Sequence, residues 1–303
     1  MLRRSFLLGS LMLASWVVAH AKPATGPNFW LVKRGRGQVF ILGGGEAKDE
    51  SWFTPVLQRA FRDSSQLWLE VGPPTGPDTR DDATKKAEAD QIQKLQHESG
   101  GRTLFDVLEP SVRPRVRALM EKTGVKEEAI KSLRPWWAYY VLNGAYWSHN
   151  KPSYEPVAVD DVLRKLAIRQ GKSIHYEMAS FLDFASWMAA MSDVAQSQYI
   201  AWLVDFFDER DSGAYQDDFD WIVGNPPTRS LDRMRTRYPQ LYEAMQPKRN
   251  AWWAKKIDEL LSVGGTSFIG IGQLHVQGPD GIPEQLLRRS IVSRSQLREN
   301  PTL

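Results

Sequence analysis

Apolar residues come in short runs near both ends of the chain, which is the pattern of β-strands. Residues 28–32 and 38–42 are rich in aromatic and β-branched side chains, and the Arg-Gly-Arg-Gly segment 34–37 between them has the composition of a turn. This arrangement predicts a hairpin. Two further apolar runs, 66–71 and 266–271, predict strands at a distance of 200 residues from each other in the chain.

Helical periodicity begins directly after the hairpin. In residues 52–61 the apolar side chains recur at the spacing of one helix face, and the strand 66–71 follows. A helix between two strands predicts a β-α-β unit with parallel strands and a right-handed connection.

The middle of the chain is mostly helical in pattern. Residues 81–97 predict a charged helix that faces solvent, and a short strand is expected at 173–176. The other expected helices are 112–123, 135–147, 159–170, 180–207, 238–263 and 283–291. The fold class is therefore α/β (α+β), with a central mixed sheet built from both ends of the chain and a largely helical middle. We expect a single domain over residues 22–303, with a helical insertion at about 103–263.

The first 21 residues have the three parts of a secretory signal peptide. Arg3 and Arg4 are followed by an apolar stretch from 6 to 19, and Ala19-His20-Ala21 forms a small-x-small cleavage site. The apolar stretch is shorter than the roughly 20 residues of a membrane span. We expect cleavage after Ala21, a periplasmic or secreted product and no permanent membrane span. The twin-arginine and the general secretory routes both remain open.

Composition excludes several classes of protein. The chain has 303 residues, 42% hydrophobic and 25% charged, so it has the composition of an ordinary folded protein. It has no cysteine, which excludes thiolate metal sites and a cysteine nucleophile. The formal net charge is +3, and loss of Arg3 and Arg4 with the leader would reduce it to +1. No dense basic stripe is present, so nucleic acid is not an expected partner.

Two common catalytic motifs are also missing from the sequence. No G-x-S-x-G nucleophile elbow occurs, and the glycines at 43–45 are not followed by the Lys-Ser/Thr of a phosphate-binding loop. The 12 tryptophans could line a carbohydrate or peptide groove, but their helical spacing favours packing in the core.

Three polar side chains follow the predicted strands. Glu46 stands three places after Gly43, His275 stands three places after Gly272, and Glu70 ends the strand 66–71. Because loops at the carboxyl ends of parallel strands form the crevice of open α/β sheets, these side chains could converge on one site. Two carboxylates and an imidazole suit Mn²⁺, Co²⁺ or Zn²⁺. The alternative is that each glutamate is a solvated or ion-paired carboxylate.

Several segments resemble the TraB/PrgY/GumN family, which includes the Tiki-type metalloproteases, over nearly all of the chain after the leader. Gly272-Gln273-Leu274-His275 resembles the second of the two G-x-x-H motifs of that family, and Leu69-Glu70-Val71 resembles its intervening glutamate segment. Residues 248–253 are similar to its Arg-Asn helix, and residues 171–177 to its midchain Gly-Lys…Glu segment. At the first motif the family has histidine and this chain has Glu46.

The resemblance implies a periplasmic or secreted metal-dependent hydrolase of the peptidase kind that acts on a peptide or envelope-derived substrate. Glu46, Glu70 and His275 would hold the metal, and Arg249 would position the substrate or stabilise negative charge. The replacement of histidine by Glu46 favours an alternative, in which a degenerate relative has kept the fold, lost the chemistry and acts as an envelope binding or accessory protein. Fold-level analogy alone does not separate the two.

Overall fold

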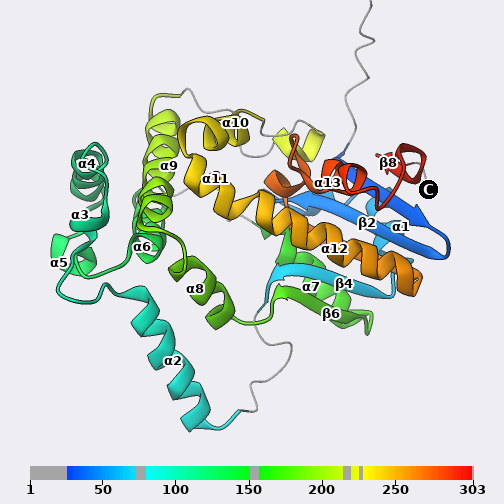
Figure 1. Ribbon diagram of the computed structural model, residues 1–303, viewed down its shortest axis with the longest axis horizontal. Helices are drawn as coiled ribbons and strands as arrows, with labels where there is room; N and C mark the ends of the chain where they lie inside the picture. The colour runs from blue at the N-terminus through cyan, green and yellow to red at the C-terminus, as the bar shows by residue number, and fades with distance from the viewer. Residues whose placement is uncertain (1–25, 73–79, 151–156, 214–219, 225–227, 302–303) are drawn as a thin grey trace, which may run out of the picture.

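The protein is described by a computed structural model, which covers residues 26–72, 80–150, 157–213, 220–224 and 228–301. The predicted signal peptide, residues 1–21, lies outside the described residues. Figure 1 shows a sheet covered by helices on one side of the molecule and a group of helices on the other.

A six-stranded mixed sheet carries strands from both ends of the chain, as the sequence predicts. Its order is β6-β4-β7-β2-β1-β8. The four strands β6, β4, β7 and β2 are parallel, whereas β1 pairs antiparallel with β2 and β8 pairs antiparallel with β1. The strands are β1 (Phe29–Arg34), β2 (Gly37–Gly44), β4 (Gln66–Val71), β6 (Ser173–Met178), β7 (Gly265–Gly272) and β8 (Leu297–Glu299).

The predicted hairpin and the predicted parallel unit are both confirmed. Strands β1 and β2 form the hairpin, and Gly35 in its turn has a φ of 57°, a conformation that glycine adopts without strain. Helix α1 (Pro55–Arg62) connects β2 to β4, and these two strands are parallel. They are not neighbours, because β7 from the far end of the chain lies between them.

Apolar side chains on the two faces of the sheet form two separate cores. On one face, α1 and α7 (Val159–Arg169) pack against the strands through residues such as Phe61 and Leu163. On the other face, α12 (Pro247–Val263) and α13 (Ile282–Arg288) pack through residues such as Trp253 and Leu286. The sheet is therefore the middle layer of three.

The remaining helices share a third core beside the sheet (Figure 1). They are α3 (Leu104–Val107), α4 (Arg113–Thr123), α5 (Glu127–Ile130), α6 (Pro135–His149), α8 (Phe181–Ala189), α9 (Asp193–Asp211), α10 (Thr228–Arg237) and α11 (Pro239–Met245). Helix α2 (Asp82–Gln96) contains no buried residue, in agreement with its charged sequence, and it contacts α8. The chain returns from this helical part to the sheet layers twice. After α6 it forms α7 and β6, and after α11 it forms α12.

Two long helices predicted from the sequence are wrong, because each is two helices. The predicted helix 180–207 breaks between α8 and α9, where Ser192 has an extended backbone and its side chain accepts a hydrogen bond from the Ala195 N–H. This is an N-cap, which begins a new helix. The predicted helix 238–263 breaks before Pro247, which cannot donate a backbone hydrogen bond and becomes the first residue of α12.

The tryptophans serve mainly as core residues. Trp52, Trp136 and Trp253 are completely buried, and Trp30 and Trp221 are nearly so. Trp252 is 37% exposed, and two others, Trp147 and Trp202, line a pocket that is described below. Among the residues that the structure describes, no helix is both long and apolar enough to cross a membrane.

Candidate functional site

The carboxyl ends of β4 and β6 place two glutamates side by side. Leu69 pairs with Tyr176 and Val71 pairs with Met178, so Glu70 and Glu177 occupy the same level of adjacent parallel strands. The Gly272 N–H at the end of β7 donates to Glu70 Oε1. A Cβ atom at Gly272 would lie 3.0 Å from that oxygen, so glycine permits this close approach of the backbone.

Arg249 on α12 bonds to both glutamate side chains. Its Nε and Nη2 donate to the two oxygens of Glu177 at 2.9 and 2.5 Å, and Nη2 also donates to Glu70 Oε2 at 2.5 Å. Trp253, one turn further along α12, donates from Nε1 to Glu177 at 2.9 Å. The Arg249 side chain is only 8% exposed, and its guanidinium carbon lies 5.2 Å from the centroid of the Trp187 ring. This is the bidentate, aromatic-supported setting that arginine suits better than lysine.

His275 joins the network through both ring nitrogens. Asn250 donates from Nδ2 to the Asp280 carbonyl at 2.8 Å, which leaves its Oδ1 as an acceptor for His275 Nδ1 at 2.6 Å. The other nitrogen, Nε2, lies 3.1 Å from Arg249 Nη1. Since arginine only donates, the hydrogen-bond pattern assigns the proton to Nδ1 and leaves the Nε2 lone pair facing Arg249.

The pKa values of the network follow from these contacts. Burial opposes the charged form of Glu70, but the positive charge of Arg249, assisted by the Gly272 N–H, lowers the pKa of Glu70 to about 2. Burial and the neighbouring Arg249 charge lower the pKa of His275 to about 4, although Glu70 acts in the opposite direction. The pKa of Arg249 is raised, because the two glutamates outweigh the effect of its burial. At neutral pH Glu70 is therefore ionised, Arg249 is charged and His275 is neutral.

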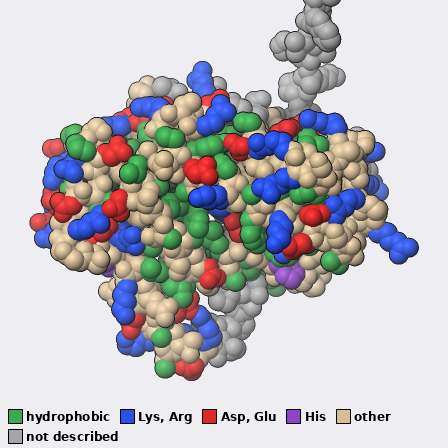
Figure 2. Space-filling model, viewed as in Figure 1, with side chains coloured by type: hydrophobic (Ala, Val, Ile, Leu, Met, Phe, Trp, Pro, Cys, Tyr) green, Lys and Arg blue, Asp and Glu red, His purple; other side chains and the backbone are tan. Residues whose placement is uncertain are grey.

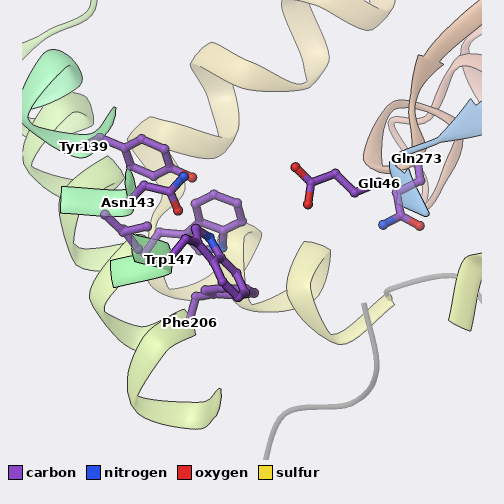
Figure 3. Close-up of a pocket in the computed structure, with 8 residues that line it drawn as sticks. Glu46, Tyr139, Asn143, Trp147, Phe206 and Gln273 are labelled. Atoms are coloured by element: carbon purple, nitrogen blue, oxygen red, sulfur yellow. The ribbon is translucent and has the colours of Figure 1, made fainter. Parts of the chain in front are cut away.

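Three of the four site residues predicted from the sequence come together in this network: Glu70, His275 and Arg249. His275 Nε2 lies 3.6 Å from Glu70 Oε2. The fourth, Glu46, belongs to the two-residue strand β3 (Glu46–Ala47), which pairs with β5 (Val157–Ala158). Its side chain is exposed and lines a pocket together with Tyr139, Asn143, Trp147, Trp202, Leu203, Phe206 and Gln273 (Figure 3).

A divalent metal, which the resemblance implies, needs ligand lone pairs that are free to face it. The Nε2 lone pair of His275 and an oxygen of Glu70 are instead directed at the Arg249 guanidinium. Within the described part of the chain, no group of three or more histidine, aspartate or glutamate side chains is placed to hold a metal ion. As folded, these donors do not fit a metal, and the metal site stays a prediction.

Two network residues received no role from the sequence, Glu177 and Asn250. Both lie in segments that resemble the family, and Glu177 stands near the end of a parallel strand in the same way as Glu70. That shared position is the signal that could have identified Glu177. The aromatic pocket was also missed, although Tyr139, Asn143 and Trp147 recur every four residues and so share one face of α6.

Comparison with known proteins identifies the class. Residues 28–294 match the TraB/PrgY/gumN family, so this chain belongs to that family. No curated protein and no solved structure matches the chain.

Proposed function

We propose that this protein is an exported member of the TraB/PrgY/gumN family that binds a ligand without a catalytic metal and acts as an envelope binding or accessory protein. One observation carries this proposal: Arg249 engages Glu70, Glu177 and His275 at once. A general base or a metal ligand needs an available lone pair. In this network His275 Nε2 faces Arg249, three of the four glutamate oxygens accept hydrogen bonds from Arg249, and the fourth, Glu70 Oε1, accepts one from the Gly272 N–H.

The buried position of the network supports a positioning role. His275 is 4% exposed and Arg249 is 7% exposed, so a substrate carbonyl has little access to either. The same bonds tie the ends of β4, β6 and β7 to α12, which fixes the edge of the sheet beside the Glu46 pocket. We infer that the network holds a binding surface in place.

The second candidate is the metal-dependent hydrolase implied by the family resemblance, with a peptide or envelope-derived substrate. One observation favours it: His275 Nε2 and Glu70 Oε2 lie 3.6 Å apart at the carboxyl edge of the sheet, where the sequence predicted a shared site. This candidate requires Arg249 to release at least one of its partners.

Metal titration separates the two candidates. Protein purified without added metal is assayed by elemental analysis and then titrated with Mn²⁺, Co²⁺ and Zn²⁺ in a calorimeter, together with the variants Glu46→His and His275→Ala. The binding proposal expects no binding in the parent and none in Glu46→His. Stoichiometric metal in the parent that is lost in His275→Ala would refute it and support the hydrolase. Binding that is gained only in Glu46→His would identify Glu46 as the reason for a lost metal site.

A further inference from the structure

The pocket that contains Glu46 lies between the two parts of the molecule. Glu46 and Gln273 come from the sheet edge, in β3 and in the short helix η3 (Gln273–Val276), whereas the other lining residues come from α6 and α9. The pocket has a volume of about 270 Å³, near the lower end of small-molecule sites, so it suits a small chemical group. Figure 2 shows hydrophobic side chains gathered in the centre of one face, between the two parts.

Glu46 is held so that its carboxylate faces the aromatic side chains on the other side of the pocket. These are Tyr139, Trp147, Trp202 and Phe206, which together form the aromatic wall. The Glu46 backbone is fixed by its pairing with Ala158 and by Trp221, whose Nε1 donates to the Glu46 carbonyl at 3.0 Å. Figure 3 shows the carboxylate directed across the pocket toward Tyr139 and Asn143. Burial, Tyr140 and the charge of Glu46 all raise the pKa of Tyr139, which is consistent with this proximity and keeps the phenol neutral. Glu46 is thus the one formally charged side chain among the eight described lining residues.

The aromatic wall is preorganised. Tyr139 stacks on Tyr199 with ring centroids 3.9 Å apart and an interplanar angle of 4°, and Trp202 lies nearly parallel to both rings. Arg210 lies over the Trp147 ring at 4.5 Å from its centroid, so this ring already attracts one cation. The charge of Arg210 is partly balanced by Asp211, whose pKa it helps to lower. Electron-rich ring faces opposite a carboxylate are the usual setting for an ammonium group.

Two polar atoms of the lining residues are buried without a hydrogen-bond partner among the described residues. One is an acceptor, Gln273 Oε1, and the other is a donor, Trp202 Nε1. A buried polar atom without a partner is unfavourable, so a ligand that supplies both partners would bind more tightly. Because both atoms have almost no accessible surface, a ligand reaches them only after the side chains around them move, and the complementary ligand then carries a donor for Gln273 and an oxygen acceptor for Trp202.

We propose that this pocket binds an organic ammonium group with an adjacent oxygen acceptor, as in the amino terminus of a short peptide. The ammonium would pair with the Glu46 carboxylate against the aromatic wall and donate to Gln273 Oε1, and the oxygen would accept from Trp202 Nε1. This inference rests on the proposed binding function and names its ligand class. Ethanolamine, the head group of a common lipid, offers the same chemistry from another source.

Calorimetry on the full chain tests the inference with four probes: tetra-alanine with a free amino terminus, the same peptide acetylated at its amino terminus, ethanolamine and glucose. We expect the free peptide to bind and acetylation to weaken its affinity about tenfold or more, because the charge-assisted bond is lost. Ethanolamine that binds more tightly than the peptide would indicate a lipid source. Glucose binding alone, or equal affinity for the acetylated and free peptides, would overturn the ammonium assignment.

A pair of variants locates the site. Glu46→Gln keeps the shape of an exposed side chain but removes its charge. It should lower the affinity for the free peptide about tenfold. Glu50→Gln removes a second exposed carboxylate four residues away, outside the pocket, and should leave the affinity unchanged. Circular dichroism of both variants checks that they are folded. Equal affinities in the two variants would refute the assigned pocket. Since the metal titration above uses metal ions and this one uses peptide and ethanolamine, failure here leaves the metal-free function open, and metal binding there leaves this pocket open.

Discussion

Glu70 and Arg249 lie 179 residues apart in the chain and form a 2.5 Å ion pair at the carboxyl edge of the sheet. The pair joins a strand from the first quarter of the chain to a helix from the last quarter. Glu177 and His275 bond to the same guanidinium, so one positive charge is shared by two largely buried carboxylates and one histidine tautomer is fixed. Arg249 is therefore the common partner of Glu70, Glu177 and His275.

Replacing Arg249 by methionine should destabilise the protein by about 3–5 kcal/mol, because two buried carboxylates lose their counter-ion. Chemical unfolding followed by tryptophan fluorescence measures the change in the free energy of unfolding. The matched control is Arg102→Met, which breaks an exposed ion pair with Asp193 of similar length, 2.6 Å. Its free energy of unfolding should stay close to that of the parent. Equal losses in the two variants would show that the buried network adds no special stability.

A half-buried acid near this edge, Asp160, gives a pH-dependent prediction. Burial, assisted by the charge of Glu70, raises the pKa of Asp160 from 3.8 to about 7. The folded state therefore holds a proton that the unfolded state releases, and Asp160 lowers stability as pH rises from 3.8 to about 7. Asp160→Asn should remove this slope, which is at most about 1.4 kcal/mol per pH unit, and gain stability over the parent at pH 8.

Thermal unfolding of the parent and of Asp160→Asn from pH 4 to pH 8 checks this prediction. Asp82→Asn is the control, because its side chain is exposed on α2 and does not act on Asp160. It should follow the pH profile of the parent. An Asp160→Asn profile that stays parallel to the parent over the whole range would mean that Asp160 does not titrate in this window.

The leader gives a prediction about export. Arg3, Arg4 and Ala19-His20-Ala21 predict a mature protein that begins at Lys22. Intact-mass analysis of the periplasmic fraction measures the amino terminus, and a product there that retains Met1 would contradict the prediction. If the twin-arginine route is used, changing both Arg3 and Arg4 to lysine should leave the precursor in the cytoplasm. Unchanged export of that double variant would indicate the general secretory route.

The sequence predicted most of the local structure and part of the site. Strand endings and family-like segments led to Glu70, His275 and Arg249, and these three meet. The position of Glu46 could not be predicted in the same way. It lies in the short strand β3, and the pairing of that strand with β5 is a contact over more than 100 residues that leaves no local pattern.

The order of the strands in the sheet also depends on contacts between distant segments, which local sequence patterns do not reveal. Nothing in the sequence between β2 and β4 indicates that β7 separates them, because insertion of a distant strand is decided by tertiary packing. The two missed helix breaks, by contrast, had visible signals. Ser192 is a good N-cap, and Pro247 is unfavourable inside a helix, but the apolar periodicity continues across both positions.

Two glycines allow a paired test of packing near the site. A Cβ atom at Gly43 would lie 2.3 Å from Val276 Cγ2 and 3.3 Å from Gln273 Cα, so the end of β2 can approach η3 only without a side chain. Gly43→Ala should therefore lower the free energy of unfolding by about 1–3 kcal/mol through overpacking.

Gly144 lies on the exposed side of α6, where a Cβ would meet nothing within 4 Å. Gly144→Ala should stabilise the protein by about 0.5–1 kcal/mol, because alanine favours the helix. Urea unfolding of both variants measures the two free energies, and a loss of the same sign and size in each would refute the packing argument for Gly43.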